Sequence, residues 1–337
     1  MTSGDFQTHN EEDEIVTTQG NTMKKLSLVL LPLIILFAAG WLTTSDTEKL
    51  KFFTGLERQA AGLSQKQINI ENHTIQYLDG GQGEVILMIH GFGANKDNWL
   101  RFAKEFKGKY RIIAPDLPGF GESTILENIS YDAVPQAKRL QQFLKALAID
   151  KVHIVGNSMG GYIAGNFSAL YPESVKTTWL LNPLGVQGAE PSEMFNAILE
   201  GKQPYVLPRN ESEFRLLLSK VFVNMPFTPD FAIRALSNDF QKHYSSNEQI
   251  ALEIHKEKDN TIVFKHPINE VLKQHSNPLL VIWGDQDKIL SPDGLRAMKD
   301  NIPTATTVMM KDMGHAPMIE NPSLTADIVK DFLSKNG

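Results

Sequence analysis

A mostly parallel β-sheet flanked by helices, the architecture of the α/β class, is the fold that the sequence predicts. Short continuous apolar runs alternate along the chain with stretches of helical pattern. Runs such as Val85–Ile89, Val152–Val155 and Leu279–Trp283 show no polar alternation, which is typical of strands covered on both faces. Strands that alternate with helices form parallel sheets covered on both sides, so we expect one such sheet here.

The expected elements follow in order along residues 67–183 and 269–337, which we take as the core. Gln67–Ile70 and Thr74–Tyr77 alternate in polarity and predict a β-hairpin. Further strands are expected at Val85–Ile89, Tyr110–Ala114, Val152–Val155, Trp179–Leu181, Leu279–Trp283 and Thr306–Met310. Helices are expected over 132–148, 159–171, 291–300 and 322–335.

Residues 184–268 interrupt this alternation. They contain no clear buried strand but many large apolar side chains, among them Met194, Phe214, Phe222 and Phe231. We interpret the segment as a mainly helical cap over the carboxyl edge of the sheet. Most of these side chains should form the cap's own small core, and a subset should line an apolar pocket.

The N-terminal part has a different composition. Residues 1–22 form a polar, acidic tail, unless Met23 is the true start, and residues 23–42 are almost entirely apolar after two lysines. The apolar run would span roughly 25 Å as a helix. It is either a signal anchor with Trp41 at the far interface or a cleaved signal peptide, with a buried core helix as a third alternative. An anchor would leave the following domain periplasmic, and cleavage would release it. Residues 43–66 predict a charged linker, with a short amphipathic helix through Leu50, Phe52, Phe53 and Leu56 as the alternative.

Composition restricts the classes of function. The formal net charge is −6, and no cluster of Lys and Arg is present, which disfavours a nucleic-acid partner. The chain contains no cysteine, which excludes disulfides, a thiol nucleophile and thiolate metal ligands. We expect neither a metal nor a cofactor.

A glycine–serine turn after one predicted strand is the first chemical signal. The pentapeptide G-N-S-M-G of residues 156–160 follows Val152–Val155 and precedes a helical stretch, with Ser158 at its centre. Glycines on both sides permit a strained serine backbone and a close approach of neighbouring chains. The turn would present the Ser158 hydroxyl at a helix N-terminus, where the dipole favours a developing negative charge. Ser158 is therefore the expected nucleophile.

Two main-chain N–H groups are expected to lie beside the Ser158 hydroxyl. The run His90-Gly91-Phe92-Gly93 follows the strand Val85–Ile89, and its loop would bring the Phe92 N–H beside the Met159 N–H. Together these N–H groups would form an oxyanion hole. His90 is expected to shape this loop, because another histidine is better placed as the base.

That histidine is His315, which follows the last predicted strand and precedes the last predicted helix. From there a base can reach the serine across the top of the sheet. The acid comes from the run Trp283-Gly284-Asp285-Gln286-Asp287. The position along the chain leaves Asp285 and Asp287 as alternatives.

From about residue 67 onward the chain resembles α/β-hydrolase-1 proteins, and more narrowly bacterial lipases of the Moraxella and Psychrobacter type (bacterial lipase family V) and the membrane-anchored monoacylglycerol lipase. In this family the aspartate of the G-x-x-D pattern is the acid, which implies Asp287 and leaves Asp285 as a loop hydrogen-bonder. The resemblance is carried by residues 90–99, 115–123, 156–161, 283–287 and 314–318.

The resemblance implies a serine hydrolase that cleaves lipid esters through Ser158, Asp287 and His315. Phe92, Met159, Leu184 and Phe222 are expected to contact the substrate. The stretch G-N-S-M-G-G is also shared with hydrolases that cleave carbon–carbon bonds in aromatic catabolism, so such an enzyme, or a short-chain carboxylesterase, is the alternative. A non-catalytic binding module is a remote one, because all three expected catalytic residue types are present.

Overall fold

The computed structural model of the chain describes residue 1, residue 41 and residues 43–336. The expected acidic tail and almost all of the apolar run at 23–42 lie outside the described residues. Within the described part, no helix combines the length and the apolar character needed to cross a membrane.

An eight-stranded sheet forms the centre of the fold, in the order β1-β2-β4-β3-β5-β6-β9-β10. The two pairings β1–β2 and β2–β4 are antiparallel, and every other neighbouring pair in this sheet is parallel. The prediction of a mostly parallel sheet is therefore confirmed. The strands are β1 (Ser64–Ile70), β2 (His73–Gly80), β3 (Glu84–Ile89), β4 (Tyr110–Pro115), β5 (Val152–Ser158), β6 (Val175–Pro183), β9 (Leu279–Gly284) and β10 (Thr306–Met310).

Helices cover both faces of this sheet. Successive side chains of β3 point to opposite faces: Leu87 belongs to one hydrophobic cluster with α4 and α5, and Ile86 belongs to another with α3 and α13. Both residues are fully buried, as expected for a strand covered on both sides. The helices and 3₁₀ turns of the core are η1 (Lys96–Trp99), α3 (Leu100–Lys104), α4 (Ala133–Ala146), α5 (Met159–Leu170), η2 (Pro172–Ser174), α10 (Ile268–Val271), α11 (Asp293–Asn301), α12 (Pro317–Glu320) and α13 (Pro322–Asn336).

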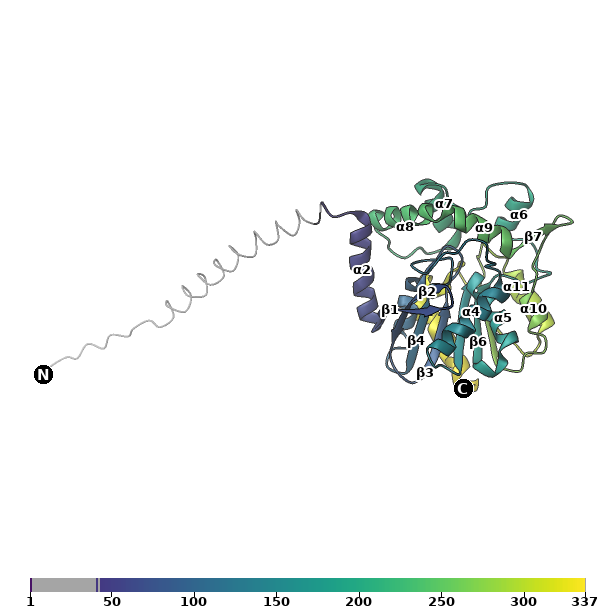
Figure 1. Cartoon of the computed structure of the whole chain (residues 1–337), viewed down its shortest axis with the longest axis horizontal. Helices are drawn as coiled ribbons and strands as arrows, with labels where there is room; N and C mark the ends of the chain where they lie inside the picture. Colours follow the sequence, from purple (N-terminus) through teal and green to yellow (C-terminus); the bar gives the residue numbers. More distant parts are fainter. Residues whose placement is uncertain (2–40, 42, 337) are drawn as a thin grey trace.

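The segment after β6 forms a cap of four helices and a short hairpin. These are α6 (Glu193–Leu199), α7 (Glu211–Val221), α8 (Asp230–Lys242), α9 (Tyr244–Ile254), β7 (Lys256–Lys258) and β8 (Thr261–Val263). Ser192 and Asn210 cap α6 and α7 by accepting hydrogen bonds from main-chain N–H groups. Figure 1 shows the cap helices lying across one end of the sheet.

The segment expected as a linker forms a regular helix, α2 (Asp46–Ala61). Ser45 and Glu48 form a reciprocal capping box at its start, which stabilises the first turn. Arg58 of α2 donates two hydrogen bonds of 2.7 Å each to the carboxylate of Asp97. At the other end of α2, Asp46 forms an ion pair of 2.7 Å with Arg234 of α8. The helix is therefore fixed to both the core and the cap.

Candidate active site

Ser158 is the last residue of β5 and has φ 56° and ψ −122°. A positive φ is strained for a residue other than glycine, and such strain is concentrated at functional sites. The glycines on either side, Gly156 and Gly160, are required because there is no room for a Cβ atom at either position. A Cβ atom on Gly156 would lie 2.1 Å from the carbonyl oxygen of Gly160, and one on Gly160 would lie 2.1 Å from that of Ile89. The tight turn between β5 and α5 therefore depends on both glycines.

Asp287 and His315 form a buried pair that follows β9 and β10. Asp287 Oδ2 lies 2.8 Å from His315 Nδ1. The other oxygen, Oδ1, accepts the N–H groups of Ile289 and Leu290 at 2.8 and 3.0 Å. With a carboxylate as partner, Nδ1 of the imidazole is the donor, which leaves the lone pair of a neutral ring on Nε2. The pair thus holds one tautomer of His315.

The two aspartates of this loop have different surroundings. Asp285 is exposed, and its Oδ1 accepts the N–H of Met313 at 3.3 Å. Asp287 is buried and bonds His315. Of the two alternatives left by position along the chain, the structure brings Asp287 to the imidazole.

Two asparagines that sequence reasoning missed hold the Asp287–His315 pair. Asn182, at the end of β6, donates from Nδ2 to Asp287 Oδ2 at 2.7 Å, with a φ of 45°. Asn157 donates from Nδ2 to the carbonyl oxygen of His315 at 3.0 Å. The only sequence signal for Asn182 is its place before Pro183 at the end of a strand, which by itself indicates a turn.

His90 is not available as a base. Its Nε2 accepts the N–H of Leu117 at 2.9 Å, and its Nδ1 donates to the carbonyl oxygen of Gly91 at 2.8 Å. Burial lowers the pKa of the ring, which favours the neutral form. His90 therefore fixes the loop that follows β3, as expected.

That loop passes directly against Ser158. A Cβ atom on Gly91 would lie 3.3 Å from the Cβ of Ser158. The next residue along is Phe92, whose ring contacts Phe120 with centroids 5.8 Å apart. Met159 is the first residue of α5, where N–H groups have no acceptor within the helix. The main chain at Gly91 thus lies against Ser158, which directly precedes the start of α5.

A buried ion-pair network supports the same loop. Lys96 is almost fully buried, and its ammonium lies 2.7 Å from both Asp116 and Glu122. Asp116 also accepts the main-chain N–H of Lys96 at 2.7 Å. Because a buried ammonium is costly without such partners, the network holds the loop after β3 in one conformation.

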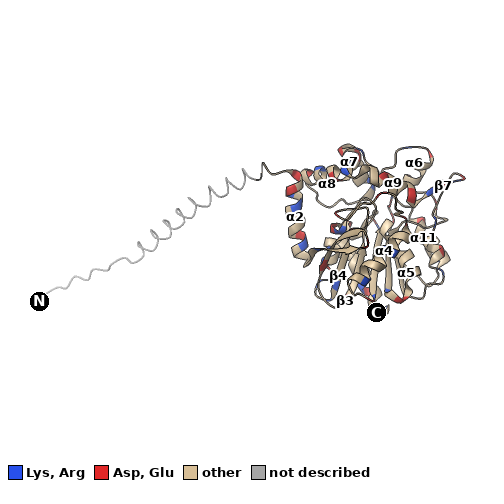
Figure 2. Ribbon diagram, viewed as in Figure 1, with Lys and Arg blue, Asp and Glu red and all other residues tan. Residues whose placement is uncertain are grey.

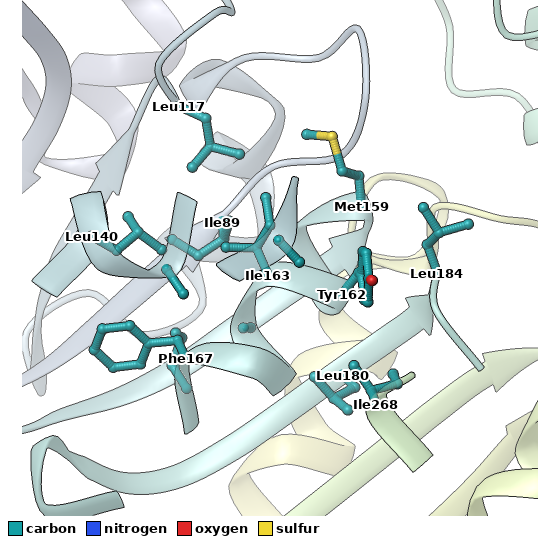
Figure 3. Packing of buried hydrophobic residues seen from close by; sticks show 14 of the residues in the cluster. Ile89, Leu117, Leu140, Met159, Tyr162, Ile163, Phe167, Leu180, Leu184 and Ile268 are labelled. Carbon is teal, nitrogen blue, oxygen red and sulfur yellow. The ribbon is translucent and has the colours of Figure 1, made fainter. Parts of the chain in front are cut away.

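A cavity of about 580 Å³ lies over this site. Ser158 and His315 are on its wall, together with side chains from α2, α7 and α8. Of the four expected substrate contacts, Phe92 and Phe222 line the cavity. The side chains of Met159 and Leu184 belong instead to the hydrophobic core, as Figure 3 shows. They are 1% and 7% exposed. Met159 could therefore contribute only through its main chain.

Residues of cap and core provide most of the apolar wall. They include Val206, Phe214, Leu217, Leu218, Val221, Phe222, Met225, Leu236, Phe240, Ile289 and Met318. Polar and charged side chains line the rest of the wall, among them Glu57, Asp97 and Arg101 on the side of α2 and of the loop after β3. Within the described part of the chain, no group of three or more His, Cys, Asp or Glu side chains could hold a metal ion.

A family model described as the alpha/beta hydrolase fold matches residues 84–322. The chain belongs to the α/β-hydrolase family. This α/β-hydrolase is 33% identical over 298 residues to lipase 1 of Psychrobacter immobilis, with 87% of this chain and 90% of the relative covered. It is 29% identical over 293 residues to a monoacylglycerol lipase of Homo sapiens, with 82% and 84% covered. The resemblance inferred from the motifs is confirmed.

Two solved structures are also similar to this α/β-hydrolase. A membrane phospholipase A, described as a bacterial virulence factor, superimposes with a TM-score of 0.82 at 35% identity, covering 92% of this chain and 98% of that one. A serine hydrolase involved in carbazole degradation superimposes with a TM-score of 0.66 at 25% identity, covering 81% and 99%.

Proposed function

We propose that the protein is a serine hydrolase that cleaves carboxylic esters of lipids, with Ser158 as nucleophile, His315 as base and Asp287 as acid. The observation that carries this proposal is the buried Asp287–His315 pair, whose histidine lines the same cavity as Ser158, the serine of a strained turn. A hydroxyl, an imidazole and an orienting carboxylate are the groups that nucleophilic acyl transfer requires.

The reaction would proceed through an acyl-enzyme. His315 Nε2 removes the proton of Ser158, whose Oγ attacks the ester carbonyl carbon. The N–H groups of Phe92 and Met159 stabilise the oxyanion, each contributing roughly 2.7–4 kcal/mol in comparable sites. His315 then protonates the leaving alcohol, and a water molecule releases the acid by the same steps.

The cavity supports a fatty-acyl substrate. A volume of about 580 Å³ lies within the range typical of pockets for drug-sized ligands. Its wall is mainly aliphatic and aromatic, and burial of each methylene group of an acyl chain contributes about 0.8 kcal/mol. Relatives named as lipases and monoacylglycerol lipase are consistent with an acylglycerol or a related lipid ester.

We also propose that residues 23–42 bring the enzyme to a membrane, with the hydrolase domain outside the cytoplasm. The apolar run in the sequence supports this, as does the similarity to a membrane phospholipase A. The enzyme would then lie beside its substrate. Mass spectrometry of the mature N-terminus would distinguish an uncleaved anchor from a cleaved signal peptide.

Hydrolysis of a graded lipid panel tests the function. The full chain is assayed with mono-, di- and triacylglycerols and with a phospholipid, each carrying acyl chains of several lengths. We expect fatty acid to be released from at least one class with long acyl chains. Absence of release from every long-chain ester would contradict the proposal, provided that a short-chain ester is hydrolysed by the same preparation.

Cleavage of a carbon–carbon bond is the second candidate. The shared stretch G-N-S-M-G-G at 156–161 favours it. A ring-fission product with a vinylogous diketone and a series of p-nitrophenyl esters separate the two functions. Turnover of the ring-fission product, together with an optimum at short acyl chains, would support this second candidate over a lipase.

A further inference from the structure

The mouth of the cavity carries an unusual concentration of exposed apolar side chains. Phe53 of α2 and Met225 and Phe227 of the α7–α8 loop all line the cavity, yet they are 44%, 39% and 88% exposed. Of the thirteen exposed large hydrophobic side chains in the described part of the chain, seven belong to α2, α7 or that loop. We call Phe53, Met225, Phe227 and Phe231 the apolar rim.

The apolar rim is continuous with the end of the N-terminal apolar run. The indole of Trp41 lies edge-on to Phe53 and Phe231, with ring centroids 5.7 and 6.3 Å apart. Phe53 and Phe231 stack on each other at 5.7 Å. Trp41 is the penultimate residue of the apolar run in the sequence, so this end of the run lies at the mouth. Tryptophan is also enriched where apolar segments meet the membrane interface.

The loop that carries Phe227 suits a lipid environment. Pro226 and Pro229 lie on either side of Phe227, and proline has no main-chain N–H group. Fewer hydrogen-bond donors of this loop would therefore lose their water if the loop entered an apolar phase. The base of the loop is fixed, because Glu320 accepts the N–H groups of Val223 and Asn224 at 3.3 and 2.8 Å. The loop therefore presents Phe227 to solvent from a tethered base.

The charges around the apolar rim are largely paired. Arg215 forms ion pairs with Glu211 and Asp230, and Arg234 pairs with Asp46. Figure 2 shows both signs of charge along α2 and α8, with no large field of one sign. Contact with a partner surface would therefore depend on apolar insertion rather than on attraction to an oppositely charged surface.

We infer that the apolar rim inserts into the interface of a lipid bilayer, so that the cavity opens toward the membrane. Interfacial segments of this kind bury their apolar side chains by about 5–10 Å at the boundary of headgroups and acyl chains. A lipid ester could then enter the cavity between α2 and the α7–α8 loop without crossing water. This inference rests on the proposed function only for the identity of the molecule that enters.

Site-directed labelling tests the insertion without requiring turnover. The chain contains no cysteine, so Phe227→Cys provides a single attachment point for an environment-sensitive fluorophore. The labelled full chain is reconstituted in phosphatidylcholine vesicles that contain lipids with a nitroxide quencher at a shallow acyl position. Leu252→Cys on α9 is the matched control, because Leu252 is 72% exposed and outside the rim.

We expect quenching at position 227 to be several-fold stronger than at position 252. Equal quenching at both positions would overturn the inference. A signal at position 227 that changes with protein concentration but not with the quencher lipid would also overturn it, and would indicate a second copy of the chain on this surface. Position-dependent quenching without hydrolysis of any lipid ester would leave the inference intact and contradict the proposed function.

A second pair of variants links the apolar rim to catalysis. Phe227→Ser and Leu252→Ser are compared by the ratio of hydrolysis rates for a vesicle-borne ester and a water-soluble ester. We expect Phe227→Ser to lower this ratio several-fold and Leu252→Ser to preserve it. An unchanged ratio in Phe227→Ser, with both variants folded, would contradict a membrane-facing mouth.

Discussion

The main-chain N–H of His315 donates to the carbonyl oxygen of Val221 at 2.7 Å. Val221 is the last residue of cap helix α7, so the loop of the proposed base is bonded directly to the cap. The residue before His315 also packs tightly against Val221, since a Cβ atom on Gly314 would lie 2.3 Å from the same carbonyl oxygen. Displacement of α7 would therefore also displace the main chain of His315.

Glu320 strengthens this contact and should act as a positioning residue. Its carboxylate accepts the N–H of Gly314 at 3.1 Å in addition to the two N–H groups at the base of the α7–α8 loop. Glu320→Gln replaces one accepting oxygen with an NH₂ group, which should loosen His315. We expect kcat to fall about tenfold, the equivalent of ~1.4 kcal/mol, with a smaller change in KM.

The matched control for this variant is Glu248→Gln on α9, where the carboxylate is exposed and accepts one long hydrogen bond, of 3.4 Å, from Tyr244. Steady-state kinetics on a soluble ester provides the comparison. Equal kcat values for Glu320→Gln and the control would argue against a positioning role for Glu320.

Asn182 should orient the proposed acid. Asn182→Gly removes the amide that donates to Asp287 but accepts the positive φ without strain. Hydrogen bonds to charged groups contribute ~1.5–3 kcal/mol, so we expect kcat to fall by roughly one to two powers of ten. Asn182→Ala should lose a similar activity and should unfold at lower urea concentration than Asn182→Gly, because alanine is strained at this φ. A glycine variant with normal kcat would exclude this role for Asn182.

A substitution at Gly55 tests whether residues 46–61 form helix α2. Gly55 lies in the interior of α2 and is exposed, and a Cβ atom added to it would have no atom of another segment within 4 Å. Gly55→Ala should stabilise the helix by about 0.5–1 kcal/mol and raise the unfolding midpoint. An unchanged or lower midpoint would indicate that residues 46–61 behave as the linker expected from the sequence.

The pH dependence of stability should include a contribution from Asp79. Burial opposes ionisation of this carboxyl group, but hydrogen bonds from Arg111 and Lys66 outweigh burial and leave its pKa below the ordinary value. Because the pKa of Asp79 is lower in the folded than in the unfolded state, the ionised group stabilises the folded protein at pH values above the unfolded-state pKa. This stabilisation is lost as the pH falls below about 4. Asp79→Asn should therefore destabilise the protein by ~1.5–3 kcal/mol at pH 7.

Urea unfolding at pH 7 and at pH 3 checks this prediction. The difference between Asp79→Asn and the unmodified chain should shrink at pH 3. Asp331→Asn, which removes an exposed ion pair with Lys335, should change stability by less than about 0.5 kcal/mol at either pH. A difference for Asp79→Asn that persists at pH 3 would contradict the assignment.

The sheet and its motifs were predictable because strong local patterns encode them. The continuous apolar runs predicted β3, β5 and β9 to within a few residues, and the glycines around Ser158 predicted the turn. Helix α2 was only partly predicted, although the capping box of Ser45 and Glu48 is a recognisable local signal.

The supports of the site could not be predicted, because they are contacts between distant segments. The hydrogen bond from Asn182 to Asp287 joins residues 105 positions apart, and no local pattern specifies it. The same holds for the contact of Val221 with His315, which depends on how the cap docks. The position of Leu184 in the core likewise follows from the path of the chain after β6.

Covalent labelling of the serine tests the central claim most directly. The unmodified chain, Ser158→Ala and Ser334→Ala are treated with a fluorophosphonate probe, and the modified peptide is located by mass spectrometry. Ser334 is an exposed serine near the end of α13 and serves as the control. We predict labelling at Ser158 in the unmodified chain and in Ser334→Ala, and none in Ser158→Ala. Labelling that survives Ser158→Ala would contradict the assignment of Ser158 as the nucleophile.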